Sequence, residues 1–169
     1  NDIDINNFIS ELPFKLTNSQ INSYQEILED LTNTFPMKRL LQGDVGSGKT
    51  VVAAIAVYAV VKSGFQVAFM APTEVLAEQH LKSISEFLKY SDIDIYFLSS
   101  SVKDRDNVMK SISTGKPGLY IGTHALIQEK VLFSNLGLVI IDEQQRFGVD
   151  QRKKLITDSD IVPDQLVMT

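Results

Sequence analysis

Cysteine is absent from this 169-residue sequence. Its absence excludes a disulfide framework and thiolate metal sites, and it fits the reducing cytoplasm. Long apolar segments are missing as well: the longest apolar run, at 51–61, has 11 residues, whereas a membrane-spanning helix needs about 20. We therefore expect a buried helix there and no membrane partner. No charged segment followed by an apolar core opens the chain, so we expect no secretory signal.

An excess of positive charge is a third absence, because the formal net charge is −5. Proteins that bind nucleic acids are often basic. If this chain contacts DNA, the contacts should therefore come mainly from backbone N–H groups and hydroxyl groups, or from other domains.

Strand-like and helix-like segments, in contrast, alternate along almost the whole chain. Strand-like runs lie at 37–43, 66–72, 93–99, 118–123, 137–142 and 165–169, and helical spacing is found at 17–31, 49–64, 73–90, 102–115 and 124–131. This order predicts an α/β fold, a parallel sheet with helices on both faces. We expect residues 1–12 to form a linker or lead-in and residues 13–169 to form one domain.

The segment GDVGSGKT, at 43–50, matches the phosphate-binding pattern G-x-x-x-x-G-K-[ST] and stands between a predicted strand and a predicted helix. Its glycines let the backbone wrap tightly, so that N–H groups point at phosphate oxygens. The residues expected to supply those groups are Gly46, Ser47, Gly48, Lys49 and Thr50. Lys49 should also reach the phosphates as a point charge, and the Thr50 hydroxyl should bind Mg²⁺. A glycine-rich turn that only caps a helix is the alternative.

Two adjacent carboxylates, Asp142 and Glu143, stop the apolar run at 137–141. In an open parallel sheet, ligands bind at the carboxyl ends of the strands. A P-loop protein that hydrolyses a nucleotide needs a carboxylate for its Mg²⁺ shell and a group that deprotonates water. We therefore predict that Asp142 holds Mg²⁺, partly through water, and that Glu143 is catalytic together with Lys49. A solvated turn at the strand end is the alternative.

The base of the nucleotide is indicated by what lies upstream and by two missing signatures. Neither the N-K-x-D pattern of GTPases nor the serine-glycine-glycine-glutamine signature of ABC ATPases occurs. The amide of Gln20 offers a donor and an acceptor that complement adenine, and Phe14 is a candidate to stack on the ring. A polar helix residue remains the alternative for Gln20, and a core anchor remains the alternative for Phe14.

The blocks LTNSQ, LLQGDVGSGKT, APTEVLAEQH, GTHALIQ and VIIDEQQRFGV follow one another in this order. They resemble the first ATPase lobe of superfamily 2 helicases, and the resemblance extends over roughly residues 12–169. It implies a RecA-like lobe that uses ATP and Mg²⁺, with Gln20 as the residue that reads adenine. The sequences of these blocks are most similar to those of translocases that remodel branched DNA, such as stalled replication forks and Holliday junctions, in recombination and repair.

The resemblance also suggests which residues contact DNA. APTEVLAEQH and GTHALIQ match blocks that line the nucleic-acid path, and within them Thr73, Thr123 and His124 are the candidates for contacting the DNA backbone. Alternatively, Thr73 only caps a helix and His124 only satisfies local backbone groups. His80 is expected to be a solvated residue at a helix end.

The chain departs from the resembled group at Gln145, where the usual residue is histidine. Glutamine keeps a donor and an acceptor but does not titrate. The resemblance implies that ATP chemistry survives this change and that Gln145 affects the coupling of hydrolysis to DNA movement.

A longer parent protein is implied too: a monomeric protein of the bacterial cytoplasm, whose second lobe and N-terminal wedge domain would be partners of this lobe. Without the arginines of the second lobe, we expect the isolated chain to be nearly inactive, since such residues contribute about 10³–10⁵ in rate. Two alternatives stay open, the lobe of a transcription-coupled repair translocase and a nucleotide-gated binding module that does not hydrolyse.

Overall fold

The computed structural model describes residues 4–33, 35–42, 48–98, 105–123, 132–142 and 163–169. Within these ranges the order of elements is α1 (Ile5–Ser10), α2 (Asn18–Leu31), β1 (Lys38–Leu41), α3 (Lys49–Lys62), β2 (Gln66–Met70), α4 (Glu74–Leu88), β3 (Ile95–Leu98), α5 (Arg105–Thr114), β4 (Gly118–Gly122), β5 (Leu136–Asp142) and β6 (Asp164–Met168). The helix expected at 124–131 lies outside the described residues.

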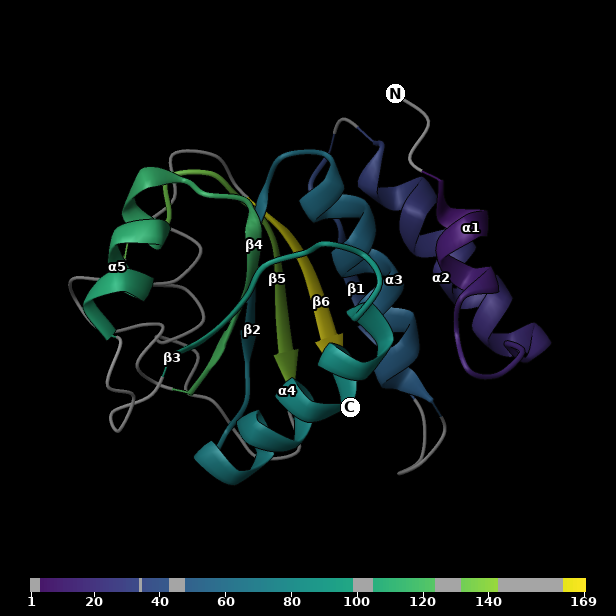
Figure 1. The fold of residues 1–169 in the computed structure, drawn as a ribbon. Coiled ribbons are helices and arrows are strands. Elements are labelled where there is room, and N and C mark those ends of the chain that lie inside the picture. The colour runs from purple at the N-terminus through teal and green to yellow at the C-terminus, as the bar shows by residue number, and fades with distance from the viewer. Residues whose placement is uncertain (1–3, 34, 43–47, 99–104, 124–131, 143–162) are drawn as a thin grey trace.

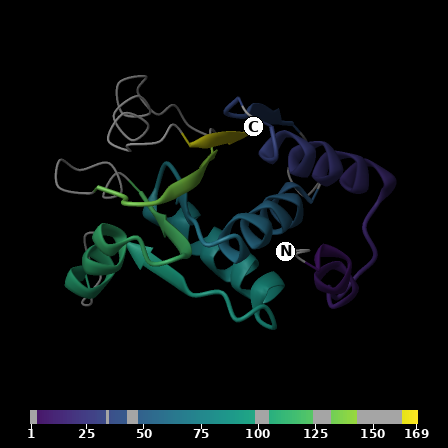
Figure 2. The same ribbon diagram turned by 90° about the horizontal axis from the view of Figure 1, so that it is seen from above.

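The strands form one sheet in the order β1-β6-β5-β2-β4-β3, and every neighbouring pair is parallel. Parallel sheets are stable when helices cover both faces, and that is the arrangement here. Helices α1 to α4 lie on one side of the sheet and α5 lies on the other (Figures 1 and 2). The predicted α/β fold is confirmed.

The two faces of the sheet are set by the alternation of side chains along each strand. In β5, Leu138 and Ile140 belong to the apolar cluster that contains residues of α1 to α4, whereas Val139 and Ile141 belong to the cluster that contains residues of α5. Asp142 follows the parity of Leu138 and Ile140. Its carboxylate is therefore directed to the side of the sheet on which α4 lies.

Helix α3 is the centre of the larger cluster and is apolar on almost every side. Its buried residues are Val51, Val52, Ala53, Ala54, Ile55, Ala56, Val57, Val60 and Val61. A helix without a polar face is one that is packed all round, which agrees with the buried helix expected from the sequence. Among the residues that the structure describes, no helix is both long and apolar enough to cross a membrane.

Residues 1–12 were expected to be a lead-in, but the structure places helix α1 within them. Asp4 caps this helix by accepting a hydrogen bond from Asn7 N at 2.9 Å. Phe8 is buried and stacks on Tyr58 of α3, with ring centroids 4.4 Å apart. The aromatic stack anchors α1 to the domain, although the helix has only six residues.

Candidate nucleotide and metal site

The candidate site lies at the carboxyl edge of three neighbouring strands, β1, β6 and β5. Met168 of β6 pairs with Leu41 at the end of β1 and with Asp142 at the end of β5. Because neighbouring strands lie about 4.8 Å apart, the backbones of Leu41 and Asp142 are about 10 Å apart. The end of β1 and the acidic residue that ends β5 thus lie at the same edge.

Helix α3 begins at this edge with Lys49 and Thr50. Gly48 is its N-cap, in a left-handed conformation with φ +83° and ψ 24°, and a glycine has no side chain with which to cap the helix. The first N–H groups of a helix attract anions when side chains do not satisfy them. Lys49 Nζ donates to the carbonyl oxygen of Thr169 at 2.5 Å, just beyond β6, so its ammonium group already lies at the carboxyl edge. Gly46 and Ser47 lie outside the described residues.

Gln20 contacts the start of α3 across 28 residues of sequence. Its Nε2 donates to the carbonyl oxygen of Gly48 at 3.5 Å, and its Oε1 accepts from Thr17 N at 2.9 Å. Thr17 Oγ1 in turn accepts from Gln20 N, which completes a capping box at the start of α2. The amide retains a second N–H and a second lone pair, so the capping role and adenine recognition are compatible. The contact brings Gln20 to the candidate phosphate site.

Phe14 is 43% exposed, so it is not the core anchor considered as an alternative. Its ring packs edge-on against Phe87 of α4, with centroids 5.8 Å apart. It also lines a cavity of about 620 Å³ between α1 and α2. The role of Phe14 toward adenine stays a prediction.

Asp142 is almost fully buried, with 2% of its side chain exposed, and one of its partners is His80. Nε2 of His80 lies 2.6 Å from Asp142 Oδ2, and the His80 ring packs on Phe69 with centroids 4.7 Å apart. His80 was expected to be a solvated residue at a helix end. That expectation is wrong, because His80 lies within α4 and only 12% of its side chain is exposed.

The sequence carried little signal for this contact. His80 and Asp142 are 62 residues apart, and only the pairing of β2 with β5 brings their elements together. The helical spacing of α4 does place His80 four residues from Leu76 and Ile84. Residues with this separation share a helix face, so the apolar spacing could have indicated that His80 lies on the same face as Leu76 and the buried Ile84, but it could not have indicated its partner on β5.

The side chains at the edge have the chemistry that Mg²⁺ requires. This ion prefers oxygen ligands and is usually held by one or two carboxylates, substrate phosphates and water. Asp142 offers a carboxylate and Thr50 a hydroxyl at the start of α3. Among the described residues no group of three or more histidine, aspartate or glutamate side chains is suited to hold a metal.

The candidate DNA contacts lie on the other half of the same edge. Thr73 follows β2, and Thr123 follows β4, the neighbour of β2. Thr73 Oγ1 accepts from Leu76 N at 3.2 Å, so Thr73 is the N-cap of α4, as the sequence predicted. A hydroxyl that accepts this bond still has its hydrogen to donate. His124, Glu143 and Gln145 lie outside the described residues, and their roles stay predictions.

The fold and the site define the class of protein. A parallel sheet of RecA-like type carries a P-loop helix and an acidic residue on one half of its carboxyl edge, and the model of the DEAD/DEAH box helicase family matches residues 17–168. The chain therefore belongs to the DEAD/DEAH box helicase family.

Within this class, the chain is similar to RecG. It is 54% identical to the ATP-dependent DNA helicase RecG of Aquifex aeolicus, over 95% of this chain and 21% of that protein. It is 51% identical to RecG of Bacillus subtilis, over 96% of this chain and 24% of that protein. The chain thus spans between a fifth and a quarter of the length of these relatives.

Solved structures agree with this similarity. A structure of RecG bound to a three-way DNA junction superposes with a TM-score of 0.82 at 46% identity, covering 96% of this chain and 22% of that chain. The UvsW helicase of bacteriophage T4 superposes with a TM-score of 0.70 at 17% identity, covering 98% of this chain and 58% of that chain. At that identity the second likeness shows the fold alone.

Proposed function

We propose that this chain is the ATP-binding lobe of an ATP-dependent DNA helicase or translocase that remodels branched DNA in recombination and repair. The observation that carries the proposal is the meeting of Lys49, Thr50 and Asp142 at one edge of the sheet of a helicase-family lobe. The similarity to RecG, one structure of which holds a three-way DNA junction, supports branched DNA as the substrate.

In this proposal the phosphates of ATP bind the N–H groups at the start of α3, and the Lys49 ammonium group turns from Thr169 to the phosphates. The long flexible stem of lysine permits that movement. Thr50 and Asp142 would hold Mg²⁺. When bound, this ion would neutralise the negative charge that develops on the phosphates. Glu143 takes a proton from the attacking water. Gln20, with Phe14, selects adenine beside Gly48.

DNA is proposed to bind the half of the edge formed by β2 and β4. Thr73, Thr123 and His124 would donate hydrogen bonds to phosphate oxygens, together with N–H groups at the start of α4. This mode of binding suits a chain with a net charge of −5. Gln145 would couple the nucleotide half to the DNA half.

The proposal includes partners that lie outside this chain: a second lobe and an N-terminal wedge domain of the same monomeric protein. The relatives are bacterial, and a protein that acts on their DNA would work in the cytoplasm. The lobe alone should turn over ATP slowly, because an arginine supplied by a second lobe accounts for about 10³–10⁵ in rate.

The test uses the full-length protein and a fluorescently labelled three-way junction. We expect ATP hydrolysis that the junction stimulates, and ATP-dependent strand separation. Lys49→Ala should abolish both by weakening nucleotide binding, whereas Glu143→Gln should retain nucleotide binding and lose hydrolysis. If the parent protein and Glu143→Gln hydrolyse ATP at equal rates, Glu143 is not the base. If the parent binds ATP but never hydrolyses it, the lobe is a nucleotide-gated binding module and the proposal is wrong.

A further inference from the structure

The contact between His80 and Asp142 joins the two halves of the carboxyl edge. Asp142 ends β5, on the half where the nucleotide is proposed to bind, and His80 belongs to α4, which follows β2. Strands β5 and β2 are neighbours in the sheet. Helix α4 begins after Thr73, and His80 lies seven residues further, about 10 Å along the helix axis. One rigid helix therefore runs from the proposed DNA contact to the proposed metal ligand.

The hydrogen bond itself has the properties of an orienting contact. The distance between His80 Nε2 and Asp142 Oδ2 is 2.6 Å, a close and direct contact. When the Asp142 carboxylate is in the ionised form that binds a metal, it only accepts hydrogen bonds, and in that form the N–H belongs to His80 Nε2 and the imidazole is the donor. Because only 2% of the Asp142 side chain is exposed, water has little access to replace this donor. Loss of the imidazole would leave the buried carboxylate with one hydrogen-bond partner fewer.

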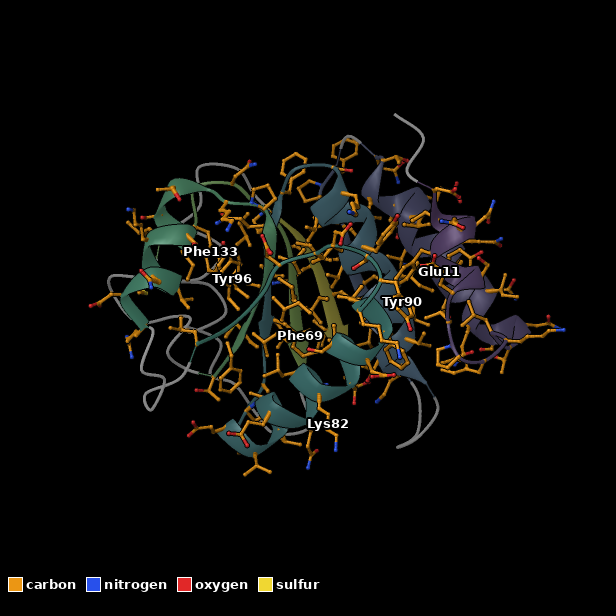
Figure 3. All side chains as sticks on the ribbon, viewed as in Figure 1. Glu11, Phe69, Lys82, Tyr90, Tyr96 and Phe133 are labelled. Atoms are coloured by element: carbon orange, nitrogen blue, oxygen red, sulfur yellow. The ribbon has the colours of Figure 1, made fainter. Side chains whose placement is uncertain are left out.

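The imidazole is held in turn by its surroundings. Its ring packs on Phe69, which lies in the middle of the sheet beneath α4 (Figure 3). Phe69 and Asp142 are on neighbouring strands, where Ile140 pairs with Phe69. The ring contact and the hydrogen bond fix His80 from two directions. Partners that orient a metal-binding side chain in this way affect metal affinity strongly, by roughly 10–100-fold when they are removed.

We propose that His80 is a positioning residue. Its N–H holds the Asp142 carboxylate in the orientation that binds Mg²⁺ with the nucleotide, and it thereby ties helix α4 to the metal site. The inference rests on the proposed function, since it takes Asp142 to be a ligand of that metal. It goes further in giving the metal site a partner on the element that carries the DNA contact.

The test measures the Mg²⁺ dependence of nucleotide binding in the full-length protein, without DNA and without turnover. A fluorescent ADP analogue is titrated in excess EDTA and then at increasing Mg²⁺ concentrations. His80→Leu keeps an apolar side chain on Phe69 and removes the donor. We expect it to raise the Mg²⁺ concentration needed for half-maximal tightening by about tenfold, with the affinity in EDTA unchanged. His80→Gln places an amide N–H near the position of Nε2, and it should return the Mg²⁺ concentration for half-maximal tightening to nearly that of the parent.

Two further variants complete the design. Lys82→Leu makes the same apolar substitution at an exposed position of α4 (Figure 3), and it should behave as the parent does. Asp142→Asn tests the metal ligand directly, and it should raise the Mg²⁺ requirement at least as much as His80→Leu. Thermal unfolding of each variant reports whether it folds. If His80→Leu does not fold, His80→Met replaces it in the same titration.

The outcomes separate the inference from the function on which it rests. If Asp142→Asn raises the Mg²⁺ requirement and His80→Leu does not, the metal role stands and the positioning role is wrong. If His80→Leu loses the same affinity for the nucleotide in EDTA and in Mg²⁺, His80 supports packing only. If His80→Gln folds but still needs the raised Mg²⁺ concentration, the N–H is excluded as the cause. If Asp142→Asn has no effect, the metal role is wrong and the inference falls with it.

Discussion

At the scale of single residues, Gly48 shows why the phosphate-binding segment needs glycine before its lysine. Gly48 adopts φ +83°, a conformation that costs other residues about 1–2 kcal/mol. A Cβ built on Gly48 would also lie 2.0 Å from Gln20 Nε2. The left-handed conformation starts α3, and the missing side chain makes room for the amide that is proposed to read adenine. The conformation thus favours glycine, and any side chain at this position would also displace the amide of Gln20.

These two requirements can be separated by mutation. We expect Gly48→Ala to lower the free energy of unfolding by roughly 2 kcal/mol, from the strained conformation and from displacement of Gln20. In a Gln20→Ala background the same change should cost only about 1 kcal/mol, because the strain remains and the clash does not. Urea unfolding of the four proteins measures this coupling.

Gly64 offers the matched control. It too has a positive φ, +95°, but no atom lies within 4 Å of a Cβ placed there. Gly64→Ala should therefore carry the conformational cost alone and should be insensitive to Gln20→Ala. If Gly48→Ala costs the same with and without Gln20, the amide does not lie over Gly48 in solution.

At the scale of elements, the N-terminus of α4 combines a structural role with a proposed functional role. Thr73 caps the helix through its hydroxyl, and it is also proposed to contact DNA. Thr73→Ala removes the one hydroxyl that serves both roles and cannot tell the roles apart. Thr73→Asp retains an N-cap, since aspartate caps helices at least as well as threonine, but it adds a negative charge that phosphates repel.

We therefore predict that only one of the two variants is destabilised. Thr73→Ala should lower the free energy of unfolding by about 1 kcal/mol, whereas Thr73→Asp should unfold like the parent and bind junction DNA more weakly, as measured by fluorescence anisotropy at fixed salt. Thr73→Ser, which keeps the hydroxyl, is the control for both measurements. If Thr73→Asp binds DNA as tightly as Thr73→Ser does, Thr73 is an N-cap and has no contact with DNA.

The elements also show which features the sequence could predict. Helix α4 was predicted because its cap and its apolar spacing are local, and the strands were predicted because their apolar runs are short and bounded by turn residues. Helix α1 was missed because its one buried side chain, Phe8, gives no periodic pattern. The stack on Tyr58 that stabilises it is a tertiary contact.

Long-range polar contacts could not be predicted from the sequence for a related reason. Gln66 is fully buried at the start of β2, where its amide donates to the carbonyl oxygen of Ile112 and accepts from Asn135 N. His80 is similar, because its partner on β5 depends on the order of strands in the sheet. Local patterns do not determine that order. The predicted phosphate and metal residues, in contrast, carry a recognisable spacing of their own.

At the scale of the whole molecule, the sheet separates the two proposed activities from a second apolar cluster beneath α5. Tyr120 of β4 is buried there, stacked on Tyr96 with ring centroids 4.6 Å apart and edge-on to Phe133. Its hydroxyl donates to the carbonyl oxygen of Lys116 at 2.7 Å. Burial raises the pKa of the Tyr120 phenol from 10.0 to about 12, since the phenolate would lose its hydration.

This shift predicts how the stability of the molecule depends on alkaline pH. The folded state holds the phenolic proton more tightly than the unfolded state, so the stabilisation is complete below pH 10 and is lost as the pH rises toward about 12. The loss amounts to roughly 2–3 kcal/mol at its upper limit. Tyr120→Phe cannot ionise, and it loses the hydrogen bond to Lys116, about 1 kcal/mol. The parent should thus be more stable than Tyr120→Phe near neutral pH, and the difference should shrink and then reverse with rising pH. Urea unfolding of both proteins over that range measures the pH at which their order of stability reverses. Tyr90→Phe, at an exposed tyrosine, is the control. A difference that stays constant with pH would mean that the Tyr120 phenol ionises equally readily in the folded and unfolded states.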